Sequence, residues 1–203
     1  MANCYGQTNW RKTMKLLSLV SAATIVTLAG CSTGGMKSAD ENSNPMVGGA
    51  PMYASKNIIE NAVNSKDHTT LVAAVKAAGL VDTLQGEGPF TVFAPTNAAF
   101  DKLPEGAVAN LLKPENKAAL AKVLACHVVK ADALSGAIKT MIDDDMGKHP
   151  VPTIGGCTLM ATYMGDKIML EDENGRVAHV TIADVKQSNG VIHVIDAVLL
   201  PKQ

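Results

Sequence analysis

Aromatic side chains are scarce in this chain of 203 residues, which contains one Trp, three Tyr and three Phe. Flat rings stack on bases and sugars, so their scarcity argues against a groove that binds by stacking. The Lys and Arg residues form no dense cluster that could neutralise a series of phosphates. The sequence therefore predicts no nucleic-acid partner.

Groupings typical of metal and catalytic sites are also missing from the sequence. No two of the four Cys and five His have the spacing of a zinc site. The run Asp143-Asp144-Asp145 lacks the alternating ligands and the Gly of a calcium-binding loop, which favours a solvated loop. No nucleophile, base and oxyanion donor can be assembled from the motifs. We therefore expect neither a cofactor nor an enzyme.

The first 30 residues are typical of an export signal. Arg11, Lys12 and Lys15 precede an apolar run of 14 residues, 16–29, which is too short to span a bilayer comfortably. The run ends in Leu-Ala-Gly-Cys, which resembles a bacterial lipobox and predicts lipidation at Cys31. The alternative is an ordinary secretory signal with a chance Cys. Translation could equally begin at Met14, since the signal is complete from there.

These features predict a bacterial envelope protein that contacts the membrane only through its lipid. Because more than one acyl chain would be attached, the anchoring should be stable. Ser32 in place of Asp after the lipidated residue favours the outer membrane, with the periplasm and the cell surface as the other locations considered. Residues 31–53 are rich in Ser, Gly, Asn and Met, lack a helical or strand period and predict a flexible tether.

Residues 54–203 predict a single domain that is helical first and β afterwards. Apolar residues recur at helical spacing in 58–63 and 71–78, and again after Pro114. Runs with a period of two follow at 157–163, 167–171, 176–185 and 191–200. Asn-Gly occurs at two joints between them, which is the signal of a tight hairpin. This order predicts an α+β fold, or a β-sandwich edged by helices, and argues against a parallel α/β sheet.

Residues 88–100 form the stretch around which we expect the domain to be organised. Residues 90–94 are β-prone, and Pro95-Thr96-Asn97 then offers a helix start in which Thr96 and Asn97 are capping side chains. Phe93 and Phe100 lie on the two sides of this strand-to-helix corner. The corner is therefore expected to anchor the core.

Two long motifs in the chain resemble those of a known family. Residues 91–100, Thr-Val-Phe-Ala-Pro-Thr-Asn-Ala-Ala-Phe, with Leu103-Pro104 closely resemble the first signature of fasciclin-like domains. Residues 189–196, Asn-Gly-Val-Ile-His-Val-Ile-Asp, and their continuation to Pro201 resemble the second. The resemblance covers about 54–201. It implies a compact wedge of two β-sheets with helices along one edge, displayed on cell surfaces and used for adhesion.

The chain departs from the family at its central Tyr-His element. His127 matches this element, but Cys126 stands where the family usually has Tyr. In animal members this region is linked to integrin contact, so that partner is not carried over. The resemblance then implies contact with a cell-surface or matrix protein of unknown identity.

Some members of the family are thought to carry a carotenoid or a lipid, and this is the alternative function. Methionines are numerous late in the chain. They either fill a core that is poor in aromatic rings or line a groove for such a ligand. The methionines concerned are Met141, Met146, Met160, Met164 and Met169.

We expect the motif residues to maintain the fold. His127, His193 and Asp196 could also be read as a metal or acid/base cluster, but a strand places His193 and Asp196 on opposite faces. Cys126 and Cys157 either form a disulfide, which we favour in an exported protein, or remain free thiols. The predicted structural set is Phe93, Pro95, Thr96, Asn97, Phe100, His127, Asn189, Gly190, His193 and Asp196.

Overall fold

The computed structural model describes residues 44–202. The predicted signal peptide, the predicted lipidation site at Cys31 and most of the predicted tether lie outside the described residues. Within them, the chain first forms a hairpin of two short antiparallel strands, β1 (Met46–Val47) and β2 (Ala50–Pro51).

This hairpin belongs to the domain, so the domain begins before residue 54, and the last residues of the predicted tether, 31–53, are part of it. Gly48 and Gly49 have φ values of +58° and +76°, which a Gly-Gly turn adopts without strain. Val47 and Met52 are only 4% and 2% exposed and pack into the core. The composition suggested a spacer because turn glycines and tether glycines look alike in sequence.

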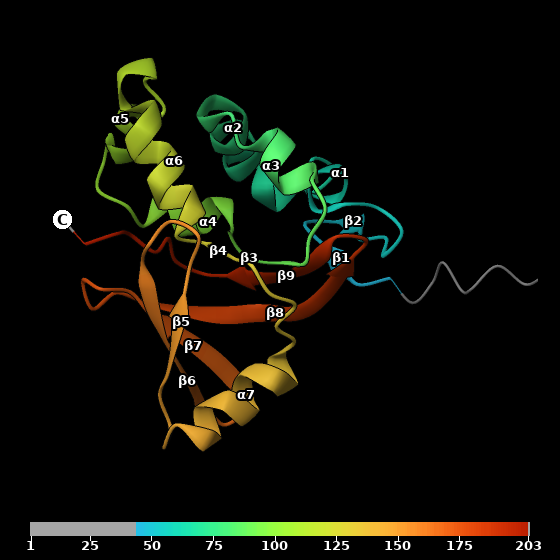
Figure 1. The fold of residues 1–203 in the computed structure, drawn as a ribbon. Coiled ribbons are helices and arrows are strands. Elements are labelled where there is room, and N and C mark those ends of the chain that lie inside the picture. Colours follow the sequence, from blue (N-terminus) through green and yellow to red (C-terminus); the bar gives the residue numbers. More distant parts are fainter. Residues whose placement is uncertain (1–43, 203) are drawn as a thin grey trace, which may run out of the picture. The chain divides into compact units, whose positions relative to one another are not determined.

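A layer of helices covers one side of the sheet (Figure 1). The predicted helix after Pro114 begins as a 3₁₀ turn, and the predicted helices at 58–63 and 71–78 are present. The layer consists of α1 (Ile58–Ala62), η2 (Lys66–His68), α2 (Thr69–Ala78), α3 (Val81–Gln85), α4 (Asn97–Asp101), α5 (Ala107–Leu111), η3 (Pro114–Asn116) and α6 (Lys117–Ala125).

The larger strands form a seven-stranded sheet in the order β4-β3-β9-β8-β7-β6-β5. They are β3 (Phe90–Pro95), β4 (Val128–Val129), β5 (His149–Pro152), β6 (Thr158–Met164), β7 (Lys167–Glu171), β8 (Val177–Gln187) and β9 (Gly190–Ile195). Strand β9 ends at Ile195 and is therefore shorter than the predicted strand at 191–200. β4 and β5 are the outer strands, and β5 carries Pro150 and Pro152. The α+β class predicted from the sequence is confirmed.

The sheet has two arms. The first arm consists of β4, β3 and β9, the second arm consists of β7, β6 and β5, and the long strand β8 lies between them and pairs with both. It pairs with β9 on one side and β7 on the other, and its pairing with β9 shifts register twice between Val180 and Val185. Bulges of this kind bend a strand and increase its twist. The two sheets implied by the family resemblance therefore correspond to two arms that share one strand.

Each arm has its own apolar core. Helices α1 to α6 pack against β3, β4 and β9, with Val92 and Ala94 pointing into that core. On the other side, α7 (Ser135–Asp144) packs beside β6 and β5, away from the other helices (Figure 1). Phe93 belongs to this second core, so β3 is buried on both faces.

Candidate functional site

The strands of the two sequence motifs lie side by side and run parallel. β3 pairs with β9 in register from Phe90 opposite Gly190 to Pro95 opposite Ile195. The sequence predicted hairpins and argued against a parallel α/β sheet. This one parallel pair is possible because the long crossover from β3 to β9 passes through the whole second arm. The meeting of the two motifs is the natural place to search for a functional site.

The start of this pair leaves no room for side chains. A Cβ atom added to Gly190, whose φ is +154°, would overlap the Phe90 carbonyl oxygen and lie 2.8 Å from the Phe90 nitrogen. Likewise, a Cβ on Gly88 would overlap the Asn189 carbonyl group. Both glycines therefore serve the close approach of two backbones.

The two motif asparagines connect elements through hydrogen bonds to the backbone. Asn189 Nδ2 donates to the carbonyls of Leu84 and Gly86, and its Oδ1 accepts from the Ile58 N–H. Asn97 lies inside α4, where it accepts from the Thr70 N–H at 3.0 Å and donates to the Lys66 carbonyl at 2.9 Å. Asn189 thus ties α1 and the end of α3 to the start of β9, whereas Asn97, the first residue of α4, ties that helix to η2 and α2.

The strand-to-helix corner packs as a structural joint. Thr96 is the N-cap of α4, and its hydroxyl accepts from the Ala99 N–H at 3.3 Å. Pro95 ends β3, and Phe100 is 8% exposed on the helical side of the sheet. The corner thus joins β3 to α4 through a capping hydrogen bond and a buried ring.

His127 is buried and both ring nitrogens are hydrogen-bonded. Nδ1 donates to the Val123 carbonyl at 2.8 Å, and Nε2 accepts from the Leu199 N–H at 3.0 Å. The ring therefore joins α6 to the C-terminal segment in its neutral form. Burial lowers the pKa of His127 to about 4, although the Val123 carbonyl and Asp172 oppose this shift.

Acidification should therefore destabilise the domain through His127. Because the unfolded chain binds this proton near pH 6.5 and the folded chain only near pH 4, the contribution is complete above pH 6.5 and is lost as the pH falls toward 4. The loss in unfolding free energy is on the order of 3 kcal/mol. Urea unfolding between pH 7.5 and 4.5, with ¹³C NMR of the ring, checks this. A His127 ring that titrates near pH 6.5 in the folded protein would contradict it.

His193 and Asp196 do not interact with each other. His193 Nε2 donates to the Ala133 carbonyl at 2.8 Å, its Nδ1 accepts from the Asp184 N–H, and its ring stacks on Phe93 at 5.7 Å. Burial lowers the pKa of His193. The ring is therefore held as a neutral part of the core.

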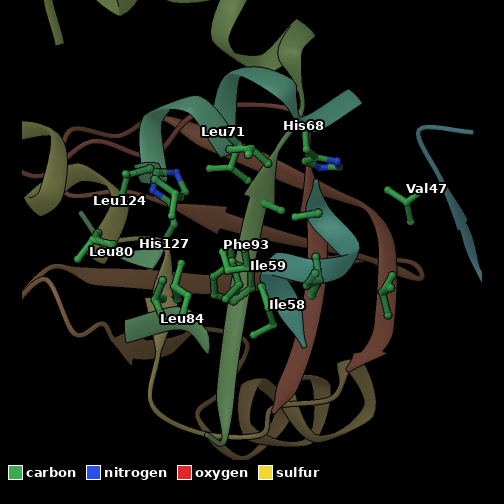
Figure 2. A pocket seen from close by; sticks show the side chains of 18 of the residues that line it. Val47, Ile58, Ile59, His68, Leu71, Leu80, Leu84, Phe93, Leu124 and His127 are labelled. Atoms are coloured by element: carbon green, nitrogen blue, oxygen red, sulfur yellow. The ribbon is translucent and has the colours of Figure 1, made fainter. Parts of the chain in front are cut away.

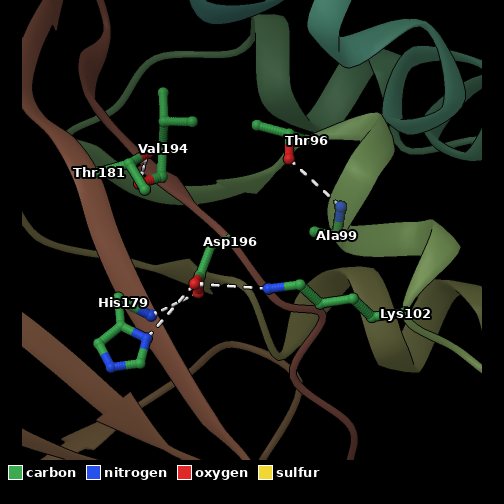
Figure 3. Close-up of polar contacts among 7 residues, drawn as sticks. All are labelled: Thr96, Ala99, Lys102, His179, Thr181, Val194 and Asp196. Carbon is green, nitrogen blue, oxygen red and sulfur yellow. Dashed lines mark hydrogen bonds and ion pairs between the residues drawn. The ribbon is translucent and has the colours of Figure 1, made fainter.

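Asp196 belongs to a surface cluster with His179 and Lys102 (Figure 3). Its carboxylate accepts from the His179 N–H at 2.8 Å, and lies 3.4 Å from His179 Nδ1 and 3.5 Å from Lys102 Nζ. Partial burial opposes ionisation of Asp196, but the His179 N–H, Lys102 and the His179 ring outweigh it and lower its pKa. Sequence reasoning missed His179 and Lys102, since neither lies in a motif position.

Cys126 and Cys157 are joined by a disulfide, with Cα atoms 5.4 Å apart. Both residues are buried, at 0% and 2% exposure. The bond connects the end of α6 to the loop before β6 and so ties the helical layer to the second arm.

Removing this disulfide in a Cys126→Ala, Cys157→Ala protein should lower the unfolding free energy. A closed loop with a sequence separation of 31 residues corresponds to about 3 to 4 kcal/mol by chain entropy. Urea unfolding with and without reductant measures the effect. Reductant should weaken the parent protein and leave the double variant unchanged, whereas two extra free thiols in the unreduced, unfolded parent would contradict the disulfide.

A small apolar cavity lies beneath α1, α2 and α3 (Figure 2). Its volume is about 50 Å³, and aliphatic side chains such as Ile58, Leu71 and Leu84 line it together with His68 and His127. His68 Nδ1 is bonded to the Ser65 hydroxyl, but its buried Nε2 has no hydrogen-bond partner. Burial lowers the pKa of His68, an effect that the Ala94 carbonyl and Asp67 partly oppose. The cavity is too small for a drug-sized ligand.

A wider apolar groove of about 390 Å³ lies between α7, β4 and β5. Val129, Ile138, Met141, Val151 and Ile154 are among the residues that line it. Met141 is one of the late methionines whose role the sequence left open.

Beside this groove, the tip formed by α7 and β6 exposes a small patch around Tyr163. The Tyr163 hydroxyl donates to Asp143 at 2.5 Å, and this bond raises the Tyr163 pKa. Lys139 Nζ lies 5.8 Å from the ring centre and 3.0 Å from Asp166. Met164, beside Tyr163, is 74% exposed. We call Lys139, Asp143, Tyr163, Met164 and Asp166 the Tyr163 patch.

Among residues 44–202, no three or more His, Cys, Asp or Glu side chains are grouped to hold a metal ion. Nor is any helix in this part of the chain long and apolar enough to cross a bilayer.

Known proteins resemble the chain in sequence and fold. The model of the fasciclin domain family matches residues 66–201. Protein sll1483 of Synechocystis sp. is 45% identical over 148 residues, which cover 71% of this chain and 73% of that protein. Transforming growth factor-beta-induced protein ig-h3 of Sus scrofa is 38% identical over 135 residues, 64% of this chain but 17% of that protein. A FAS1 domain pair from the insect cell adhesion molecule fasciclin I has a TM-score of 0.52 at 24% identity, covering 64% of this chain and 43% of that one, which indicates a shared fold.

Proposed function

Because this chain belongs to the fasciclin domain family, we propose that it mediates adhesion or another surface interaction without catalysis. The observation that carries the proposal is the Tyr163 patch. Apart from Asp196, the motif side chains described above are buried or hydrogen-bonded to the backbone of neighbouring elements, whereas Tyr163 is held at the surface by Asp143 and Lys139 next to an exposed Met164. An aromatic ring already fixed in place loses little entropy on binding, which suits a contact residue.

Attachment of the native host's cells to a surface tests this role of the patch. We expect a Tyr163→Ser variant to support attachment no better than a deletion strain, while Val63→Ser, at an exposed apolar position elsewhere, restores it fully; the two residues are 36% and 48% exposed. A photocrosslinker at position 164 should capture one discrete surface or matrix protein, and one at position 63 should not. Equal attachment by both variants would refute the patch.

We also propose that the protein is lipid-anchored through Cys31 in a bacterial envelope, with the outer membrane as its location. Support comes from the signal and lipobox pattern of the first 31 residues. Labelling with a radioactive fatty acid should mark the parent and a Cys4→Ala variant, but not a Cys31→Ala variant. A Cys31→Ala protein that still carried the label would exclude this anchor.

A second function, carriage of a lipid or carotenoid, is favoured by the groove between α7, β4 and β5. Its volume of about 390 Å³ falls within the range of small-molecule sites, about 300 to 1,000 Å³. Protein purified from its own host should then contain an extractable lipid or absorb visible light, and Ile154→Asp should abolish this. A parent protein free of any ligand would leave adhesion as the sole function.

A further inference from the structure

The solvent-facing side of the second arm carries a row of side chains that runs across three strands and ends just after β9. Thr162 on β6 lies opposite Met169 on β7, and Met169 lies opposite His179 on β8. Asp196 continues the row, because its backbone N–H donates to the His179 carbonyl. The neighbouring residues Leu170, Ala178 and Ala161 are buried, so this row lies on the outer face.

Within the row, His179 is oriented by Asp196. The carboxylate contacts Nδ1 at 3.4 Å, and Lys102 and the His179 N–H hold the carboxylate in turn. Figure 3 shows the other ring nitrogen pointing away from Asp196. The His179 side chain is 47% exposed. A carboxylate on one imidazole nitrogen and an open second nitrogen is the arrangement that histidine ligands of metal ions commonly show.

Methionine residues lie on the same outer face as this imidazole. Residues directly opposite on paired strands have Cβ atoms about 5 Å apart, so Met169 and His179 can reach one ion. Met160 and Met164 flank Thr162 on the same face of β6 and lie diagonally across from Met169. Met160 and Met169 are half-buried. Thioether sulfur is a soft ligand that selects Cu(I) over hard cations.

We propose that Met169 and His179, completed by the thioether of Met160 or Met164, form a surface site for a soft monovalent cation of the Cu(I) type. Asp196 is the positioning residue that keeps the proton on Nδ1 and the lone pair on Nε2. The site does not rest on the proposed adhesive function: Met169 and His179 lie outside the Tyr163 patch, and only Met164 belongs to both. It was not recognisable as a conventional metal motif because its ligands come from separate strands and include methionine.

Titration with Ag(I), a redox-inert probe of the same softness, tests the site. The protein used for this titration is the full chain with Cys4→Ser and Cys31→Ser, so that free thiols do not compete for the ion. We expect saturable binding of one ion, with the methyl ¹³C signal of Met169 shifting and that of Met46, an exposed methionine on β1, unchanged. Met169→Leu and His179→Gln should each weaken binding at least about tenfold, whereas Met46→Leu should not. Absence of binding, or equal binding by Met169→Leu and Met46→Leu, overturns the proposal.

The role of Asp196 has a readout that needs no metal. The ¹⁵N shifts of the His179 ring should report a proton on Nδ1 in the parent protein and a mixture of tautomers in Asp196→Asn. The same variant should bind Ag(I) about 10 to 100 times more weakly. An unchanged tautomer and unchanged affinity in a folded Asp196→Asn protein would remove Asp196 from the site.

Discussion

Replacing Gly190 with alanine should lower the free energy of unfolding by about 4 kcal/mol or more. A Cβ atom there overlaps the Phe90 carbonyl oxygen, which belongs to the backbone of the neighbouring parallel strand and cannot rotate away. Overpacking and strain at an unusual φ each cost about 1 to 3 kcal/mol, and here they coincide. Urea unfolding at pH 7 measures the change.

Gly175 supplies the matched control. It also follows an Asn at the joint of two strands, and its φ is +78°, but no atom lies within 4 Å of a Cβ built on it. Gly175→Ala should therefore cost only the strain of the left-handed backbone, about 1 to 2 kcal/mol. If both variants lost the same stability, the close approach of β3 and β9 would not be the reason for Gly190.

Truncating Phe93 to alanine should lower the unfolding free energy by about 3 to 5 kcal/mol, the usual range for a buried aromatic ring. Its side chain is 1% exposed, packs in the second core and stacks on His193. Loss of the ring leaves a cavity beside β3, which is buried on both faces, and removes the ring that stacks on His193. Urea unfolding with a constant m-value measures the effect.

Val177→Ala is the control for Phe93, because its side chain is 43% exposed and should change stability by less than about 0.5 kcal/mol. Attachment assays on the same proteins separate stability from contact. A Phe93→Ala protein as stable as the parent but unable to support attachment would make this corner a contact surface, against the packing described above.

The strand-to-helix corner was predictable because its signals are local. Thr96 precedes a helix at the right spacing to cap it, and the aromatic residues on either side mark the corner as core. The parallel pairing of β3 with β9 was not predictable from periodicity, because register between distant strands depends on contacts that no local pattern reports. The two Asn-Gly joints illustrate the same limit: they look equivalent in sequence, yet only Gly190 meets another backbone.

The candidate site shows a similar division. The sequence favoured structural roles for His127 and His193, and the structure gives each a set of hydrogen bonds within the core. The sequence alone could not reveal that His179 is the partner of Asp196. A period of two places His179 on an outer face, but the identity of the residue opposite depends on the register of β8 with β9 and its bulges.

The two outer strands of the sheet affect how copies of this domain behave at high local concentration. β4 is two residues long and its Val128 carbonyl already accepts from the Ile154 N–H, while Pro150 and Pro152 of β5 have no N–H group to offer an incoming strand. Neither edge can therefore template the cross-β stacking by which densely packed β-proteins convert to fibrils. Many copies of this domain can therefore be packed closely together without pairing through their sheet edges.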